Sequence, residues 1–311
     1  MQDLLRKKFS VGISLAMEYE DYKKIIDNYE LYIYSVYFSP PLGNKFHSRS
    51  VIGKQLEEAN NIHKLEKIIA YCSKKGIVVD ADLNVSGLTD EDVNRFVDYV
   101  RNNTYINEVT TLAQYGDIIH SKLNDMKLVY SFNNFYNGQR VNDYYSTIVL
   151  GKNYLRDIQS MNSLIEDGRE IKLLINNGCS FKCETCLRGT ENCEKTVKQH
   201  LEDYTFNELY AEQTLFPWEL YEIIKRIKNY DKLFFKISNR TSGYEYLTRC
   251  LDAYTNFSYV KPYIDASLYN YSIFCRMQSM RKRFEYLDYE IVEKEKVKIW
   301  NRIINECDER S

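Results

Sequence analysis

The chain has 311 residues, of which 44% are hydrophobic, and its formal net charge is −2. This length and composition allow one large domain or two smaller ones, each with a full apolar core. The near-zero charge gives no broad nucleic-acid-binding patch, because such a surface needs a clustered excess of Lys and Arg.

The amino-terminal residues, MQDLLRKKFSVGISLAM, lack the long apolar core of a signal peptide, and no apolar run reaches the length of a bilayer span. We therefore expect a cytoplasmic protein with no membrane partner. In a reducing compartment, clustered cysteines indicate metal ligands or redox groups rather than disulfides. Four of the eight cysteines are scattered, and we expect most of them to be ordinary buried thiols: Cys72, Cys250, Cys275 and Cys307.

Short β-rich runs alternate with longer amphipathic runs along most of the chain. The runs that predict strands begin at Phe9, Tyr32, Ile77, Glu108, Lys127, Ser146, Ile171 and Lys232. Helical patterns cover residues 20–29, 55–76, 89–103, 156–168 and 242–256. Thr89 is typical of a helix start, and Gly76 and Gly168 fall where helices should end.

Eight strands that alternate with helices imply parallel crossovers, and eight is the number that closes a (β/α)8 barrel of the TIM type. An open, doubly wound sheet is the alternative, but the sequence has no GxGxxG or GxxxxGK[ST] motif to support nucleotide binding. We expect a single barrel domain over residues 1–311. The barrel itself should run from about Phe9 to about Asn256, and residues 265–311 should form a C-terminal helical extension.

Polar residues at the carboxyl ends of the predicted strands, where barrel enzymes hold their active sites, are mostly amides. The candidates for substrate contact are Arg49, Asn84, Gln114, Asn153 and Asn177. Arg49 could hold a carboxylate or phosphate through its planar guanidinium, whereas each amide could instead only cap a turn. Asp80 and Asp82 share one strand face, with no carboxylate on an opposite strand to form an acid/base pair. The catalytic residues therefore stay unassigned.

Four cysteines follow the seventh predicted strand: Cys179, Cys183, Cys186 and Cys193, with the spacing C-x3-C-x2-C-x6-C. Thiolates this close in sequence can converge on one metal, so we expect all four to be ligands. Zinc is one candidate, although only Cys183 and Cys186 form a C-x2-C pair. The first three cysteines also match the C-x3-C-x2-C motif of radical S-adenosylmethionine enzymes. Those enzymes carry the motif after the first barrel strand, whereas here seven strands precede it.

A third pattern extends over much of the chain, from about Phe9 to Cys193. The stretch KLLINNGC, followed by SFKCET and Cys186, keeps a Gly-Cys-x6-Cys frame after a late strand. Three upstream stretches belong to the same pattern: TIVLGKNYLRDIQSM, TTLAQYGDII and FHSR. In these stretches the chain resembles a distant, short relative of the collagenase-like peptidase family, with Asn177 in place of that family's histidine.

This resemblance implies a barrel that holds a [4Fe-4S] cluster, because several members of the family are iron–sulfur proteins. It also implies oxygen-independent hydroxylation, or a related modification, of a small-molecule substrate or of one tethered to peptide or RNA, with a redox or protein partner. The family's last ligand lies further along the chain, so Cys250 is an alternative to Cys193 as the fourth ligand. Structural zinc, bound S-adenosylmethionine and a peptidase activity stay as alternatives.

Overall fold

The computed structural model describes residues 2–47, 55–56, 58–131, 138–151, 154–155, 157–175, 215, 217–237 and 243–255. Its eight strands pair in parallel and in sequence order, and β8 pairs with β1 to close a barrel. The strands are β1 (Phe9–Gly12), β2 (Ile33–Phe38), β3 (Val78–Leu83), β4 (Glu108–Thr111), β5 (Lys127–Tyr130), β6 (Tyr145–Leu150), β7 (Glu170–Leu174) and β8 (Leu233–Ile237).

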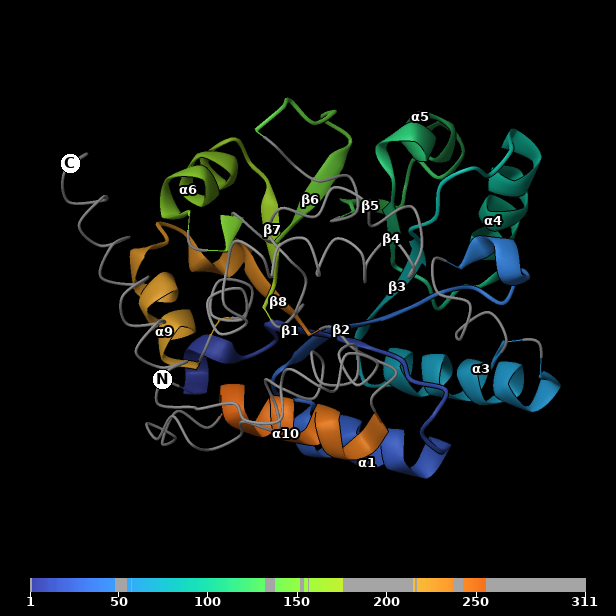
Figure 1. Cartoon of the computed structure of the whole chain (residues 1–311), viewed down its shortest axis with the longest axis horizontal. Coiled ribbons are helices and arrows are strands. Elements are labelled where there is room, and N and C mark those ends of the chain that lie inside the picture. Colours follow the sequence, from blue (N-terminus) through green and yellow to red (C-terminus); the bar gives the residue numbers. More distant parts are fainter. Residues whose placement is uncertain are drawn as a thin grey trace, which may run out of the picture.

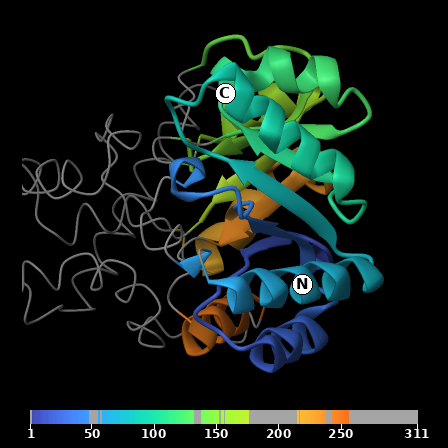
Figure 2. The same ribbon diagram turned by 90° about the vertical axis from the view of Figure 1, so that its right-hand side faces the viewer.

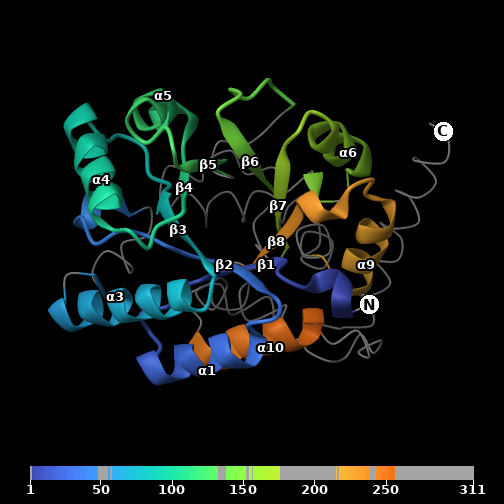
Figure 3. The ribbon, with the colours of Figure 1, turned by 180° about the vertical axis from the view of Figure 1, so that it is seen from behind.

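Helices surround the strands, as the two opposite views of the ribbon make clear (Figures 1 and 3). The α-helices of the described residues are α1 (Tyr19–Tyr29), α3 (Ala59–Lys74), α4 (Asp90–Asn102), α5 (Ala113–Lys122), α6 (Ile158–Glu166), α9 (Pro217–Arg226) and α10 (Gly243–Thr255). Short 3-10 helices cover Gln2–Leu5, Asn44–Phe46 and Tyr230–Lys232. Helix α1 packs against α3 and α10, and α4 packs against α5. In the side view, α3 and α4 lie on the outer side of the strands (Figure 2).

The apolar core lies between the strands and the helices, because each strand turns alternate residues outward. On β3, Val79 and Ala81 face outward and are fully buried, as are Ile68 and Ile69 of α3, which packs against this strand. Burial of each Val or Ile side chain contributes about 1.5–3 kcal/mol. The residues between them along each strand point to the barrel axis, and this second set forms the site described below.

Local sequence signals fix several helix ends. Thr89 caps α4 through a capping box, in which its hydroxyl accepts from the Asp92 N–H and the Asp92 carboxylate accepts from the Thr89 N–H. Gly76 and Gly168 follow α3 and α6 with φ values of 65° and 91°, which L-residues with side chains rarely adopt. The helix boundaries predicted at these three residues are therefore confirmed.

The eight predicted strands and the closed (β/α)8 barrel are confirmed. Helices α5 and α9 were not predicted. Gly116 weakens the helical signal of α5, yet it is needed there, because a Cβ at this position would collide with the hydroxyl of Tyr145. The predicted extension at 265–311 lies outside the described residues. Among those residues, no helix is long and apolar enough to cross a membrane.

The capping box gives a first prediction. Thr89→Ala should lower the free energy of unfolding by about 1 kcal/mol, because the Asp92 N–H loses its acceptor. Thr104→Ala, at an exposed position outside any helix, is the matched control and should change it by less than about 0.5 kcal/mol. Urea unfolding measures both values, and equal effects of the two substitutions would contradict the capping role.

Candidate functional site

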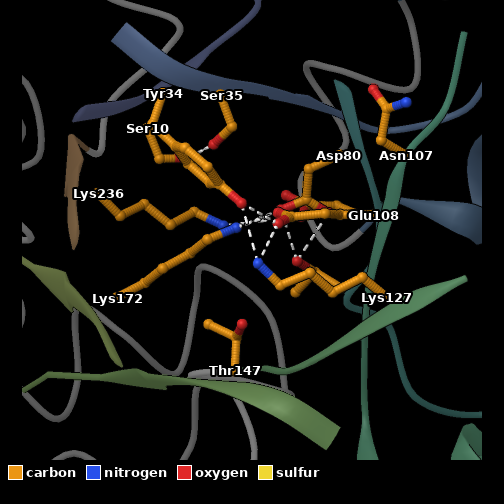
Figure 4. Close-up of polar contacts among 12 residues, drawn as sticks. Ser10, Tyr34, Ser35, Asp80, Asn107, Glu108, Lys127, Thr147, Lys172 and Lys236 are labelled. Atoms are coloured by element: carbon orange, nitrogen blue, oxygen red, sulfur yellow. Dashed lines mark hydrogen bonds and ion pairs between the residues drawn. The ribbon is translucent and has the colours of Figure 1, made fainter. Parts of the chain in front are cut away.

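The axis of the barrel is lined by charged and polar side chains. In most barrels of this fold the interior is packed with Val, Ile and Leu. Here lysines from β5, β7 and β8 point toward carboxylates from β3 and β4 (Figure 4). Glu170 of β7 adds a further carboxylate, which pairs with Lys127. Asp80 on β3 and Lys172 on β7 lie on opposite walls of the eight-stranded barrel, so their contact must cross its interior.

Glu108 is the centre of this network at the amino-terminal end of the barrel. Its carboxylate accepts from the Lys172 ammonium at 2.5 Å, from the Tyr34 hydroxyl at 2.6 Å and from the Lys127 ammonium at 2.8 Å. Lys127 also donates to Glu170 Oε2 at 2.6 Å. Because Glu108, Lys127 and Glu170 are the first residues of their strands, this layer closes the barrel at the end opposite the usual catalytic face.

Asp80 forms the next layer toward the carboxyl ends. Both of its carboxylate oxygens accept from the Thr110 hydroxyl, at 2.8 and 2.9 Å, and Lys172 Nζ lies 3.4 Å from one of them. Lys172 and Asp80 are completely buried. Lys172 thus bridges two acids, just as Lys127 bridges Glu108 and Glu170.

The proton equilibria of these groups follow from their mutual distances. Burial alone would raise the pKa of Glu108, but Lys172 and Lys127 outweigh burial and lower this pKa to about 2. Burial would likewise lower the pKa of Lys172, yet Glu108 and Asp80 hold it above its usual value. Burial, and then the negative charge of Glu108, raise the pKa of Tyr34. Glu108 and Lys172 are therefore charged at neutral pH, and Tyr34 stays protonated.

A looser ion pair lies at the carboxyl-terminal mouth of the barrel. Lys236 and Asp82 are the second-to-last residues of β8 and β3, and their charged atoms are 3.6 Å apart. The Lys236 ammonium also lies 4.0 Å from the centre of the Tyr37 ring, whose hydroxyl donates to the Ile237 carbonyl at 2.7 Å. This charged pair thus lies at the face where barrel enzymes hold their active sites.

The segment that contains the clustered cysteines begins and ends beside this mouth. Ile175, directly after β7, donates its N–H to the Lys236 carbonyl at 3.1 Å, and its own carbonyl accepts from the Leu215 N–H at 2.8 Å. Leu215 is fully buried, and its carbonyl accepts from the Tyr254 hydroxyl at 2.7 Å. Ile175 and Leu215, the described residues on either side of 176–214, are therefore hydrogen-bonded to each other at the carboxyl face.

The predicted site residues fall into two groups. Asn84 directly follows β3, and Gln114, an exposed residue near the start of α5, follows β4, so both belong to the carboxyl face of two neighbouring strands. The others lie outside the described residues: Arg49, Asn153, Asn177, Cys179, Cys183, Cys186 and Cys193. Cys72 and Cys250 are both buried, as predicted. Within the described part of the chain, no group of three or more His, Cys, Asp or Glu side chains is arranged to hold a metal.

The interior lysines were missed from the sequence. Asp80 and Asp82 do have partners across the barrel, but these partners are lysines of β7 and β8 rather than carboxylates. A signal was present, because Lys172 and Lys236 each stand between two apolar residues of a strand that parallel barrels bury on both faces. A lysine in that position must point to the barrel axis.

No family model matches the chain, and no curated protein matches it. Among solved structures, orotidine 5′-monophosphate decarboxylase of Plasmodium berghei is similar with a TM-score of 0.43 and 12% identity, over 85% of this chain and 74% of its own. A U32 peptidase is similar with a TM-score of 0.45 and 10% identity, over 75% of this chain and 92% of its own. A variant α-subunit of tryptophan synthase from Pyrococcus furiosus has a TM-score of 0.40 and 9% identity, over 80% of this chain and 98% of its own.

Removal of the buried Lys172 charge should strongly destabilise the barrel. Lys172→Met keeps most of the side-chain volume but leaves Glu108 and Asp80 without their shared cation, and we expect a loss of about 3–5 kcal/mol in the free energy of unfolding. Lys228→Met is the control, because its ion pair with Glu166 is exposed and should contribute no more than about 1 kcal/mol. Urea unfolding at pH 7 compares the two, and equal losses would show that the buried pair is not special.

Glu108 should also govern acid stability. Its pKa is lower in the folded protein than the ordinary value of 4.5, so its stabilising effect is complete above about pH 4.5 and is lost as the pH falls toward about 2. Unfolding free energies measured between pH 5 and pH 3 should therefore decrease for the natural chain. The decrease should be shallower for Glu108→Gln, which cannot take up this proton. Parallel profiles for the two proteins would contradict this role.

Proposed function

We propose that this chain is an iron–sulfur enzyme whose cluster is held at the carboxyl face of the barrel. The proposed ligands are Cys179, Cys183 and Cys186, with Cys193 as the fourth. The proposed reaction class is oxygen-independent hydroxylation, or a related modification, of a small or tethered substrate.

The position of Ile175 and Leu215, which flank the cysteine segment, is the observation that carries this proposal. Connections between a strand and the next helix in such folds usually take about 2–6 residues, and much longer ones are often functional. Residues 176–214 are far longer than this, and both ends are fastened beside the barrel mouth by the hydrogen bonds of Ile175 and Leu215. The extra length is therefore anchored at the catalytic face.

Covalent geometry limits how far the first cysteine can lie from this point. Cys179 is four residues beyond Ile175, and an extended chain spans at most about 3.6 Å per residue, so their Cα atoms are within about 14 Å of each other. The Ile175 N–H is bonded to the peptide of Lys236, whose side chain lines the mouth. A cluster bound through Cys179 would thus lie close enough to act on a substrate in the mouth.

The buried position of Cys250 favours Cys193 as the fourth ligand. Cys250 lies on α10 and belongs to the apolar core between the helices and the strands, where it is fully buried. To bind a cluster at the mouth, it would have to leave that core. The radical S-adenosylmethionine alternative is disfavoured by position, since the motif follows β7 and, among the described strands, β8 alone comes after it.

Residues at the barrel mouth would bind and orient the substrate. A bound iron–sulfur cluster supplies electron transfer or, with one iron free of protein ligands, a Lewis acid. Lys236 would hold and orient an oxygen of the substrate through its ammonium group, which it shares with the Asp82 carboxylate 3.6 Å away. Asn84 and Gln114 would offer amide hydrogen bonds from the opposite side of the mouth.

Anaerobic purification followed by iron, sulfide and zinc analysis tests this proposal. A brown protein with iron and sulfide in equal amounts is expected, and Cys179→Ala, Cys183→Ala and Cys186→Ala should each strip or destabilise the cluster. Cys72→Ala is the control and should keep full iron, because this thiol lies on the buried face of α3.

Two further outcomes are informative. Cys193→Ala should also lower the iron content, whereas iron loss in Cys250→Ala alone would move the fourth ligand beyond β8. A colourless protein with one zinc per chain would support a structural metal site instead. Full metal content in all four variants of the cysteine segment would overturn the proposed ligands.

A further inference from the structure

We infer that Lys236 binds the carboxylate of a small acidic ligand at the barrel mouth, with Ser14 as a second hydrogen-bond donor. The inference rests on the proposed function only in taking this ligand to be the substrate. It concerns residues of β8 and β1, and it does not depend on which metal the cysteines hold.

The Lys236 ammonium has more N–H donors than it has acceptors among the described residues. The residue is 7% exposed, and an ammonium carries three N–H donors. Within the described part of the chain its only close polar partner is Asp82, at 3.6 Å, which is too long for a hydrogen bond. Its remaining contact is the face of the Tyr37 ring. Buried donors normally find acceptors, so a lysine in this state at a catalytic face points to a ligand oxygen.

The other interior lysines indicate what kind of ligand fits. Lys172 lies within 4 Å of the carboxylates of Glu108 and Asp80, and Lys127 lies within 4 Å of those of Glu108 and Glu170. Each therefore serves two carboxylates, whereas Lys236 serves one among the residues described here. A second carboxylate would give Lys236 the same coordination. A dianion such as phosphate would bring more negative charge beside Asp82 and should bind less well.

Ser14 supplies an independent observation. It is 2% exposed, and its hydroxyl makes no hydrogen bond within the part of the chain that the structure describes. Ser14 lies just beyond β1, which is paired with both β8 and β2, and the preceding Ile13 still donates to the Tyr37 carbonyl at 2.9 Å. Ser14, Tyr37 and Lys236 thus come from three neighbouring strands at the same mouth. A buried hydroxyl with a free donor there suits a carboxylate oxygen.

Titration of the full-length protein with acetate, by calorimetry and by the shift in Tm, tests this inference. We expect saturable binding that weakens at least about tenfold in Lys236→Met, through loss of a charge-assisted hydrogen bond, and about threefold in Ser14→Ala. Lys228→Met, which removes an exposed lysine, should bind acetate like the natural chain. Inorganic phosphate should bind more weakly than acetate.

For one variant we expect acetate binding to become tighter, which a misfolded protein could not show. Asp82→Asn removes the competing carboxylate from Lys236 and should tighten acetate binding several-fold. Unchanged affinity in Lys236→Met, no saturable acetate binding to the natural chain, or tighter binding of phosphate would each overturn the inference. Cysteine variants that lose iron should still bind acetate, so the failure of the metal proposal and the failure of this one are distinguishable.

Discussion

The contact between Glu108 and Lys172 is the constraint on which the barrel interior depends. Two opposite charges are withdrawn from water, and their attraction must offset the cost of desolvating both. Lys127 and Tyr34 complete the coordination of the Glu108 carboxylate, and Asp80 takes up the remaining interaction of Lys172. Because each carboxylate in this network lies beside a lysine, polar residues can fill an axis that most barrels of this fold fill with branched apolar ones.

The barrel could be predicted from the sequence because its signals are local and repeated. Runs such as those of β3 and β7 are bounded by helical patterns, and Thr89, Gly76 and Gly168 fall at helix ends through simple backbone chemistry. Helix α5, one of the two helices that were not predicted, shows where this approach stops. Gly116 lowers its helical propensity, and the reason for the glycine is a tyrosine of β6 that is distant in sequence.

The site was harder to predict because its partners meet only after the sheet has closed. Nothing in the spacing of Asp82 and Lys236 indicates that β3 and β8 face each other across one mouth. Amides at strand ends, such as Asn84 and Gln114, were visible because position relative to a strand is a local property. The interior lysines were not predicted, although an isolated charge within a doubly buried strand has only the barrel axis available to it.

The order of the charges along the chain has a consequence for biosynthesis. Asp80 and Glu108 leave the ribosome long before Lys172 and Lys236, and the free edge of β1 has no partner until β8 appears. At about 5–20 residues per second, the interval between β1 and β8 is roughly ten to forty seconds. During that time the nascent chain carries an open sheet edge and an excess of acid in its interior. Solvation of those acids opposes premature collapse, and the last two strands then supply the lysines that pair with these acids and close the edge.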